Sequence, residues 1–291
     1  TCLILITPDS ERTMITFLGV AGKINEKDIN DKAVKESEMI FLEGYLWDEG
    51  EPKSAFNKAL SLSRAINNTH GIRQYLNNTG LIYEERANFE QAMEIYAECL
   101  KLSKQMQEKR SICVSYCNIG YILDFQGSYK QALKYFKRAH NLAIDIDYKA
   151  GIGGYANNMA QIYIKTNQFK KAIILLNSAK DILNDLGIAD STSCIIGKAF
   201  CYMKLGNLKV LKDEMENIDK SINQNKNYED YSALYQLSEL YDFLNQPKLS
   251  KKYIVRAHDA LLKRMYKIQT NHERDAFKNT HDAQNILIKI N

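Results

Sequence analysis

Three asparagines recur at forty-residue steps along the chain, at Asn78, Asn118 and Asn158. An amide side chain offers both a hydrogen-bond donor and an acceptor, as the peptide backbone does. A ladder of asparagines on one surface could therefore hold an extended peptide by its backbone without reading its side chains. The alternative is that these amides satisfy polar groups of neighbouring helices. The sequence alone leaves both roles open.

Further polar side chains accompany the asparagines on the same segments. We expect the following residues to share one binding surface with them: Gln74, Asn77, Tyr121, Asp124, Asn157, Gln161 and Lys165. Their mixed polarity does not identify a ligand.

Other residues that could take part in catalysis or metal binding are better explained by structural roles. Cys113 and Cys117 lie one helical turn apart, but no histidine follows at a ligand spacing. We therefore expect packing thiols rather than a metal site. His272 precedes Glu273 but lacks the second histidine of a zinc-protease helix. The sequence thus predicts no catalytic residues, no metal and no cofactor.

The segments that carry these residues repeat with a forty-residue period. Small and large residues keep this step in three copies: Gly80, Gly120 and Ala160; Tyr83, Leu123 and Tyr163; Phe89, Tyr129 and Phe169; Ala92, Ala132 and Ala172; Tyr96, Phe136 and Leu176. Polar breaks at 86–88, 126–128 and 166–168 divide each unit, so each unit is predicted to be helix, turn, helix. Small residues allow two helices to approach, and large ones fill the gaps beside them.

This order of small and large residues resembles the tetratricopeptide signature, in a longer form of about forty residues rather than about 34. Half a unit precedes the three copies at residues 51–68, and weaker fourth and fifth copies follow. The weaker copies hold Ala199, Tyr202, Gly206, Leu208, Leu211, Leu237, Tyr241, Ile254 and Ala257.

The resemblance implies a right-handed superhelix whose concave face, lined by the first helix of each unit, binds peptides or helices. Related arrays of this length use similar asparagines for peptide contact. The clamp that some chaperone-binding arrays use for a terminal carboxylate is not visible, because Asn77, Cys117 and Gly154 stand where basic residues would be needed.

The composition agrees with a helical protein. The chain has 291 residues with only 3 prolines and 14 glycines, which favours long helices over collagen-like or many-stranded folds. The net charge of +4 is too small to argue for nucleic acid or a membrane surface as a partner. Six cysteines without paired spacing, and the lack of an apolar run of about 20 residues, predict a soluble, cytoplasmic chain.

Residues 1–50 have a different pattern, with strands predicted at 2–6, 13–18 and 39–42. The segments 2–14, 17–19, 28–29 and 42–48 resemble the middle of a ribokinase-like (PfkB) sugar or adenosine kinase. Phosphoryl transfer in that family depends on a Gly-Ala-Gly-Asp-like segment, whose aspartate acts as the base, and the sequence has no such segment. We therefore expect no kinase activity. Because the chain begins at Thr1 within this resemblance, we expect a fragment or a fusion.

Together these observations predict a mainly α fold with three segments. Residues 1–50 form a short α/β remnant, residues 51–257 form a tetratricopeptide solenoid, and residues 258–291 form a continuous capping helix. The predicted function is a scaffold that binds a protein or peptide of unknown identity, with neither nucleic acid nor membrane as partner. The alternatives are an inactive kinase fragment fused to repeats and a peptide-responsive sensor module of a larger regulator.

Overall fold

The structure, a computed structural model, describes residues 2–6, 12–16, 27, 60–61, 64–65, 69–187, 191–224, 228–268 and 270–290. The chain forms two compact units, Thr1–Ile82 and Tyr83–Asn291. In the first unit, strands β1 (Cys2–Ile6) and β2 (Arg12–Thr16) pair in antiparallel fashion. Helix α3 (Thr69–Glu85) begins in this unit. The predicted strand at 39–42 lies outside the described residues, and so does the half-unit at 51–68 except for 60–61 and 64–65.

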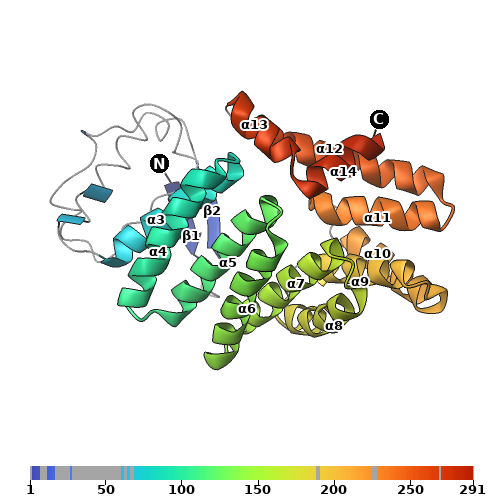
Figure 1. Ribbon diagram of the computed structural model, residues 1–291, viewed down its shortest axis with the longest axis horizontal. Coiled ribbons are helices and arrows are strands. Elements are labelled where there is room, and N and C mark those ends of the chain that lie inside the picture. Colours follow the sequence, from blue (N-terminus) through green and yellow to red (C-terminus); the bar gives the residue numbers. More distant parts are fainter. Residues whose placement is uncertain are drawn as a thin grey trace. The chain divides into compact units, whose positions relative to one another are not determined.

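The second unit is a succession of helices joined by short turns (Figure 1). These are α4 (Phe89–Gln105), α5 (Lys109–Phe125), α6 (Tyr129–Asp145), α7 (Lys149–Lys165), α8 (Phe169–Asp185), α9 (Ser191–Lys204), α10 (Leu208–Gln224), α11 (Tyr231–Phe243), α12 (Pro247–Tyr266), α13 (Asn271–Lys278) and α14 (His281–Ile290). The predicted helix–turn–helix units are confirmed, and the weaker fourth and fifth copies form the pairs α9–α10 and α11–α12.

The turns between α3 and α8 share one backbone geometry. Each connector has three residues, and the middle one adopts a positive φ: 57° at Ala87, 55° at Gln107, 72° at Gly127, 52° at Asp147 and 58° at Asn167. A residue in the left-handed conformation ends a helix, because it turns the following backbone N–H groups back toward the last carbonyls of that helix. The backbone therefore repeats every twenty residues, although the side-chain pattern repeats every forty.

These turns give a direct test of backbone strain. Gly127 has φ 72° and open space where a Cβ would lie, so Gly127→Ala is expected to lower the free energy of unfolding by about 1 kcal/mol through conformation alone. Gln107 is exposed and adopts the same conformation. Gln107→Gly should therefore raise the free energy of unfolding. The gain should be smaller than the loss in Gly127→Ala, because glycine also gains freedom in the unfolded chain. Urea unfolding checks both, and shifts of the same sign would contradict this assignment.

Close packing explains the small residues of the repeat. A Cβ on Gly120 would lie 2.6 Å from Cε1 of Phe136, whose side chain is 1% exposed. In the next unit Ala160 and Leu176 occupy the equivalent positions, and both are fully buried. The smaller leucine leaves room for the methyl group of Ala160. The core is thus a series of paired small and large residues along the helix pairs.

The first helices of successive units form an inner layer. Helix α5 packs against α7, α7 against α9, and α9 against α11. Helix α6 contacts both α5 and α7, α8 contacts both α7 and α9, and α10 contacts α9. Residues on the inner faces of α5, α7, α9 and α11 consequently lie along one surface.

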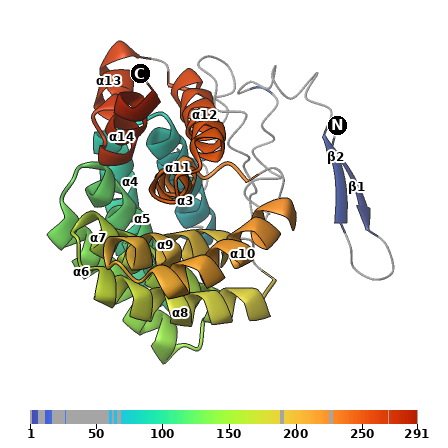
Figure 2. The same ribbon diagram turned by 90° about the vertical axis from the view of Figure 1, so that its right-hand side faces the viewer.

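The C-terminal segment is not the continuous helix that the sequence predicts. Helix α12 ends at Tyr266, and two further helices follow, with α14 packed back against α11 and α12 (Figures 1 and 2). The backbone N–H of Glu273 donates to Oγ1 of Thr270 over 3.2 Å, and the Thr270 hydroxyl donates to the Glu273 carboxylate over 2.9 Å. This Thr-x-x-Glu cap starts a new helix at Asn271 and explains the break. Among the described residues, no helix combines the length and apolar character needed to span a membrane.

Candidate functional site

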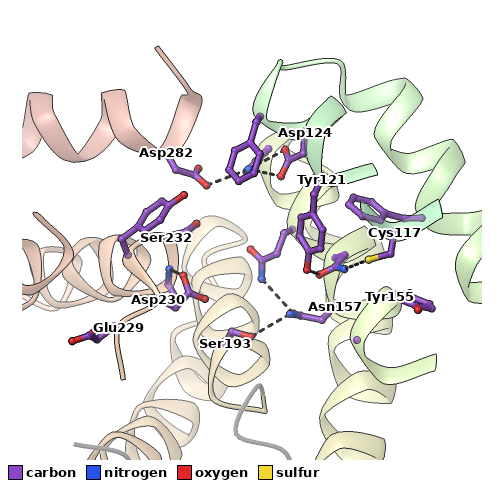
Figure 3. Close-up of a pocket in the computed structure, with 18 of the residues that line it drawn as sticks. Cys117, Tyr121, Asp124, Tyr155, Asn157, Ser193, Glu229, Asp230, Ser232 and Asp282 are labelled. Atoms are coloured by element: carbon purple, nitrogen blue, oxygen red, sulfur yellow. Dashed lines mark hydrogen bonds and ion pairs between the residues drawn. The ribbon is translucent and has the colours of Figure 1, made fainter. Parts of the chain in front are cut away.

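A cavity of about 460 Å³ lies against the inner layer of the second unit. Its walls come from α5, α7, the start of α9, and the start of α11 with the two residues before it (Figure 3). Phe136 of α6, Arg264 of α12 and Asp282 of α14 complete them. Six of the predicted site residues line it: Tyr121, Asp124, Asn157, Asn158, Gln161 and Lys165. The fold therefore brings these six side chains together.

The remaining four predicted residues lie elsewhere. Asn118 is on α5 and is 8% exposed, but it is not part of the cavity wall. The wall uses Cys117 and Tyr121 of α5 and the repeat-equivalent Asn157 and Gln161 of α7. Asn118 is one residue, or about 100°, around the helix from that stripe. Gln74, Asn77 and Asn78 lie on α3 in the first unit.

A lysine between two carboxylates is the strongest electrostatic feature of the cavity. Nζ of Lys165 lies 3.0 and 2.9 Å from the two carboxylate oxygens of Asp124 and 3.2 Å from Oδ2 of Asp282. The three side chains are only 12%, 14% and 20% exposed, respectively. In Figure 3 the dashed lines at Asp124 and Asp282 mark these contacts. The ion pairs thus join α5, α7 and α14.

The pKa values of the three groups reflect burial and mutual attraction. Burial disfavours the charged lysine, but the carboxylates of Asp282 and Asp124 outweigh it and raise the pKa of Lys165. Burial would also raise the pKa of Asp282, yet Lys165 and His281 hold it well below its usual range. For Asp124, burial prevails over Lys165, so its pKa is raised. One ammonium therefore does not fully compensate two buried carboxylates.

Amide side chains extend this polar wall across three helices. Nδ2 of Asn157 donates to Oγ of Ser193 over 3.2 Å, and Nε2 of Gln236 donates to Oε1 of Gln161 over 3.1 Å. The Tyr121 hydroxyl donates to Oδ1 of Asn158 over 2.9 Å. Of the three recurring asparagines, only Asn158 takes part in these bonds, which are of the structural kind that the sequence left open. They use only part of the hydrogen-bonding capacity of each amide, which has two N–H donors and two acceptor lone pairs.

Residues of the C-terminal helices contact residues near the start of the second unit. The guanidinium of Arg264 lies 4.8 Å from the ring centroids of both Phe125 and Phe277. Its Nη2 donates to the backbone oxygen of Glu84 over 3.3 Å. The ring of His281 meets that of Tyr129 edge to face at 6.4 Å. Segments up to 180 residues apart in sequence are thus in contact within the second unit.

Asp230, Arg264 and Asp282 were missed by sequence reasoning because they lie outside the repeat pattern. Asp230 carries one usable signal, since an aspartate before an apolar helical run predicts an N-cap. Its Oδ1 indeed accepts from the N–H of Ala233 over 3.0 Å, at the start of α11. No local pattern points to Arg264 or Asp282.

The cysteines have the packing environment that the sequence predicts. Cys113 is fully buried and Cys117 is 6% exposed. Burial raises the pKa of the Cys113 thiol to about 11 and raises that of Cys117 as well. Both groups are therefore neutral thiols that fill space near neutral pH.

Comparison with known proteins agrees with this architecture. Family models described as "Tetratricopeptide repeat" match residues 74–106 and 111–185. Neither match reaches residues 1–50, so the kinase resemblance gains no support. No curated protein matches the sequence.

Solved structures of similar fold include RapI in its apo form, with 12% identity, a TM-score of 0.61, and coverage of 81% of this chain and 94% of that chain. A Rap protein complexed with Competence and Sporulation Factor matches with 12% identity, a TM-score of 0.56, and coverage of 82% and 70%. BtubC (BKLC) from P. vanneervenii matches with 12% identity, a TM-score of 0.55, and coverage of 75% and 92%.

At this identity the likeness concerns the fold alone. Residues 74–106 and 111–185 match the tetratricopeptide repeat, and the helical part of the chain has the fold of a helical-repeat solenoid.

Proposed function

We propose that this chain is an interaction module that binds a short peptide segment of a partner in the cavity between the inner layer and α14. The observation that carries the proposal is that six residues expected from sequence to contact a peptide line one cavity of about 460 Å³. This volume lies within the range of about 300–1,000 Å³ that is typical of small-ligand sites. It suits a short segment rather than a folded domain.

The lining chemistry supports a peptide ligand. The amides of Asn158 and Gln161 can pair with backbone N–H and C=O groups, and Asn157 can donate to a backbone C=O, because its own Oδ1 already accepts two hydrogen bonds. Tyr121 and Tyr155 supply apolar surface with a polar tip. The Rap protein of similar fold was solved in complex with Competence and Sporulation Factor, which supports a ligand-binding role for this architecture.

A cavity-filling substitution tests the proposal on the whole chain. Gly154 lies in the cavity wall, and a Cβ added there meets no atom within 4 Å. Gly154→Trp should therefore fill the cavity without disturbing the core. We expect the wild-type chain to capture members of a random heptapeptide library and Gly154→Trp to lose this capture.

Two controls separate occlusion from damage. Gly154→Ala adds one methyl group at the same position and should retain capture. Ile174→Trp places the same ring on α8, where Ile174 is 69% exposed, and should also retain it. Peptides captured equally well by Gly154→Trp, or no specific capture by the wild-type chain, would overturn the proposed function.

A further inference from the structure

The charges that line the cavity are unbalanced. Two cations, Lys165 and Arg264, face four carboxylates, which are Asp124, Glu229, Asp230 and Asp282. Glu229 is exposed and pairs with Lys263 outside the wall. Asp230 caps the start of α11. The two carboxylates that remain, Asp124 and Asp282, lie deeper, with side chains 14% and 20% exposed.

Both lining cations are already engaged within the chain. Lys165 lies between Asp124 and Asp282. Arg264 is held over the rings of Phe125 and Phe277 and donates to a backbone oxygen. An anionic ligand group would have to break one of these arrangements to find a partner.

A cationic ligand group would instead meet carboxylates that are not fully neutralised. Asp124 and Asp282 share one ammonium, so that the group of three carries a net negative charge in a poorly solvated place. His281 also contacts Asp282, at 3.0 Å, but adds charge only when protonated. A buried net charge is costly until it is compensated. A second cation between α5 and α14 would provide that compensation and would have carboxylate oxygens within reach.

We propose that Asp282 on α14, together with Asp124 on α5, makes the cavity selective for a peptide that carries a lysine or arginine side chain. This inference rests on the proposed function and specifies its ligand. It assigns a specificity-determining role to α14, a helix beyond the residues that the family models match. The aspartates receive the basic group, while the amides of α7 hold the backbone beside it.

The test starts from heptapeptides captured by the wild-type chain from the random library. We expect basic residues to be enriched among them. Replacing the basic residue of a captured peptide by methionine should weaken binding to the wild-type chain about tenfold or more, since a charge-assisted hydrogen bond is lost. This measurement leaves the protein unchanged, so a folding defect cannot imitate it. Equal binding of the two peptides would overturn the inference.

Variants of the two aspartates then test whether these residues cause the preference for a basic peptide. Asp282→Asn and Asp124→Asn should each weaken binding of the basic peptide about tenfold more than binding of the methionine peptide. Asp259→Asn, on the exposed surface of α12, is the matched control and should change neither. If captured peptides are excluded by Gly154→Trp but show no preference for basic residues, the inference fails and the proposed function stands. If no peptide is captured, the proposed function itself fails.

Discussion

Replacing Lys165 with methionine is expected to lower the free energy of unfolding by about 3–5 kcal/mol, because it leaves two buried carboxylates without their counter-ion. The side chains involved are at most 20% exposed, so water cannot compensate the loss. Urea unfolding, monitored by circular dichroism at 222 nm, should show a lower midpoint for Lys165→Met than for the wild-type chain.

Lys170 on α8 provides the control. It is exposed, so Lys170→Met should change stability by no more than about 0.5 kcal/mol. Adding Asp124→Asn and Asp282→Asn to Lys165→Met should recover part of the loss, because neutral groups replace the unpaired charges. Similar midpoints for Lys165→Met and Lys170→Met would contradict the assignment of a buried ion network.

The difference between wild type and Lys165→Met should also depend on pH. The lowered pKa of Asp282 contributes stability that is present above its unfolded pKa of about 3.9 and is lost as the pH falls toward the folded value. The raised pKa of Asp124 acts in the opposite direction and offsets part of this. Once both carboxylates are protonated, Lys165 has no anion to neutralise. The difference should therefore shrink below about pH 4.

Phe136→Ala is expected to destabilise the chain by about 3–5 kcal/mol, the usual cost of removing a buried ring. Phe136 is 1% exposed and meets Tyr121 edge to face at 5.5 Å. Truncating it leaves a void beside Gly120 that the rigid helix pair cannot close. The midpoint of urea unfolding measures the loss, and Ile174→Ala at an exposed position is the control. Equal midpoints for the two variants would contradict the packing described here.

The pairing of Gly120 with Phe136 makes a sharper form of this test. Gly120→Ala alone should cost about 1–3 kcal/mol through overpacking. Combining it with Phe136→Leu copies the pair Ala160 and Leu176 of the next unit, so the double variant should lose less than the sum of the single losses. Additive losses would show that the two positions do not compensate each other.

Much of the fold follows from sequence because its contacts are local. In the repeats, each helix packs mainly against its neighbours in the chain, so small and large residues recur in phase with the helices. Gly120, Ala160, Phe136 and Leu176 could thus be placed in the core from spacing alone. The three turns within the units were also located correctly. The geometry common to all five turns was hidden, because only one of the five middle residues from Ala87 to Asn167 is glycine.

The candidate site was only partly accessible from sequence. The forty-residue step identified the segments that form the inner layer, and six expected residues line the cavity. The same step could not decide which neighbouring residues on a helix face the interior. Asn158 lies in the wall and its equivalent Asn118 does not, because the curvature of the inner layer sets how each helix is rotated.

The sequence by itself determined a repeating helical solenoid and the polar character of its inner face. Only the tertiary structure decided that α12 and α14 return to that face, where Asp282 meets Lys165 and Arg264 reaches the backbone oxygen of Glu84. The repeat pattern reports contacts between adjacent helices, which every unit must satisfy alike. The contacts of α12 and α14 with the inner face are made once, between segments that are distant in sequence. Their energy depends on the summed rotation of all intervening helices, so no local sequence pattern records them.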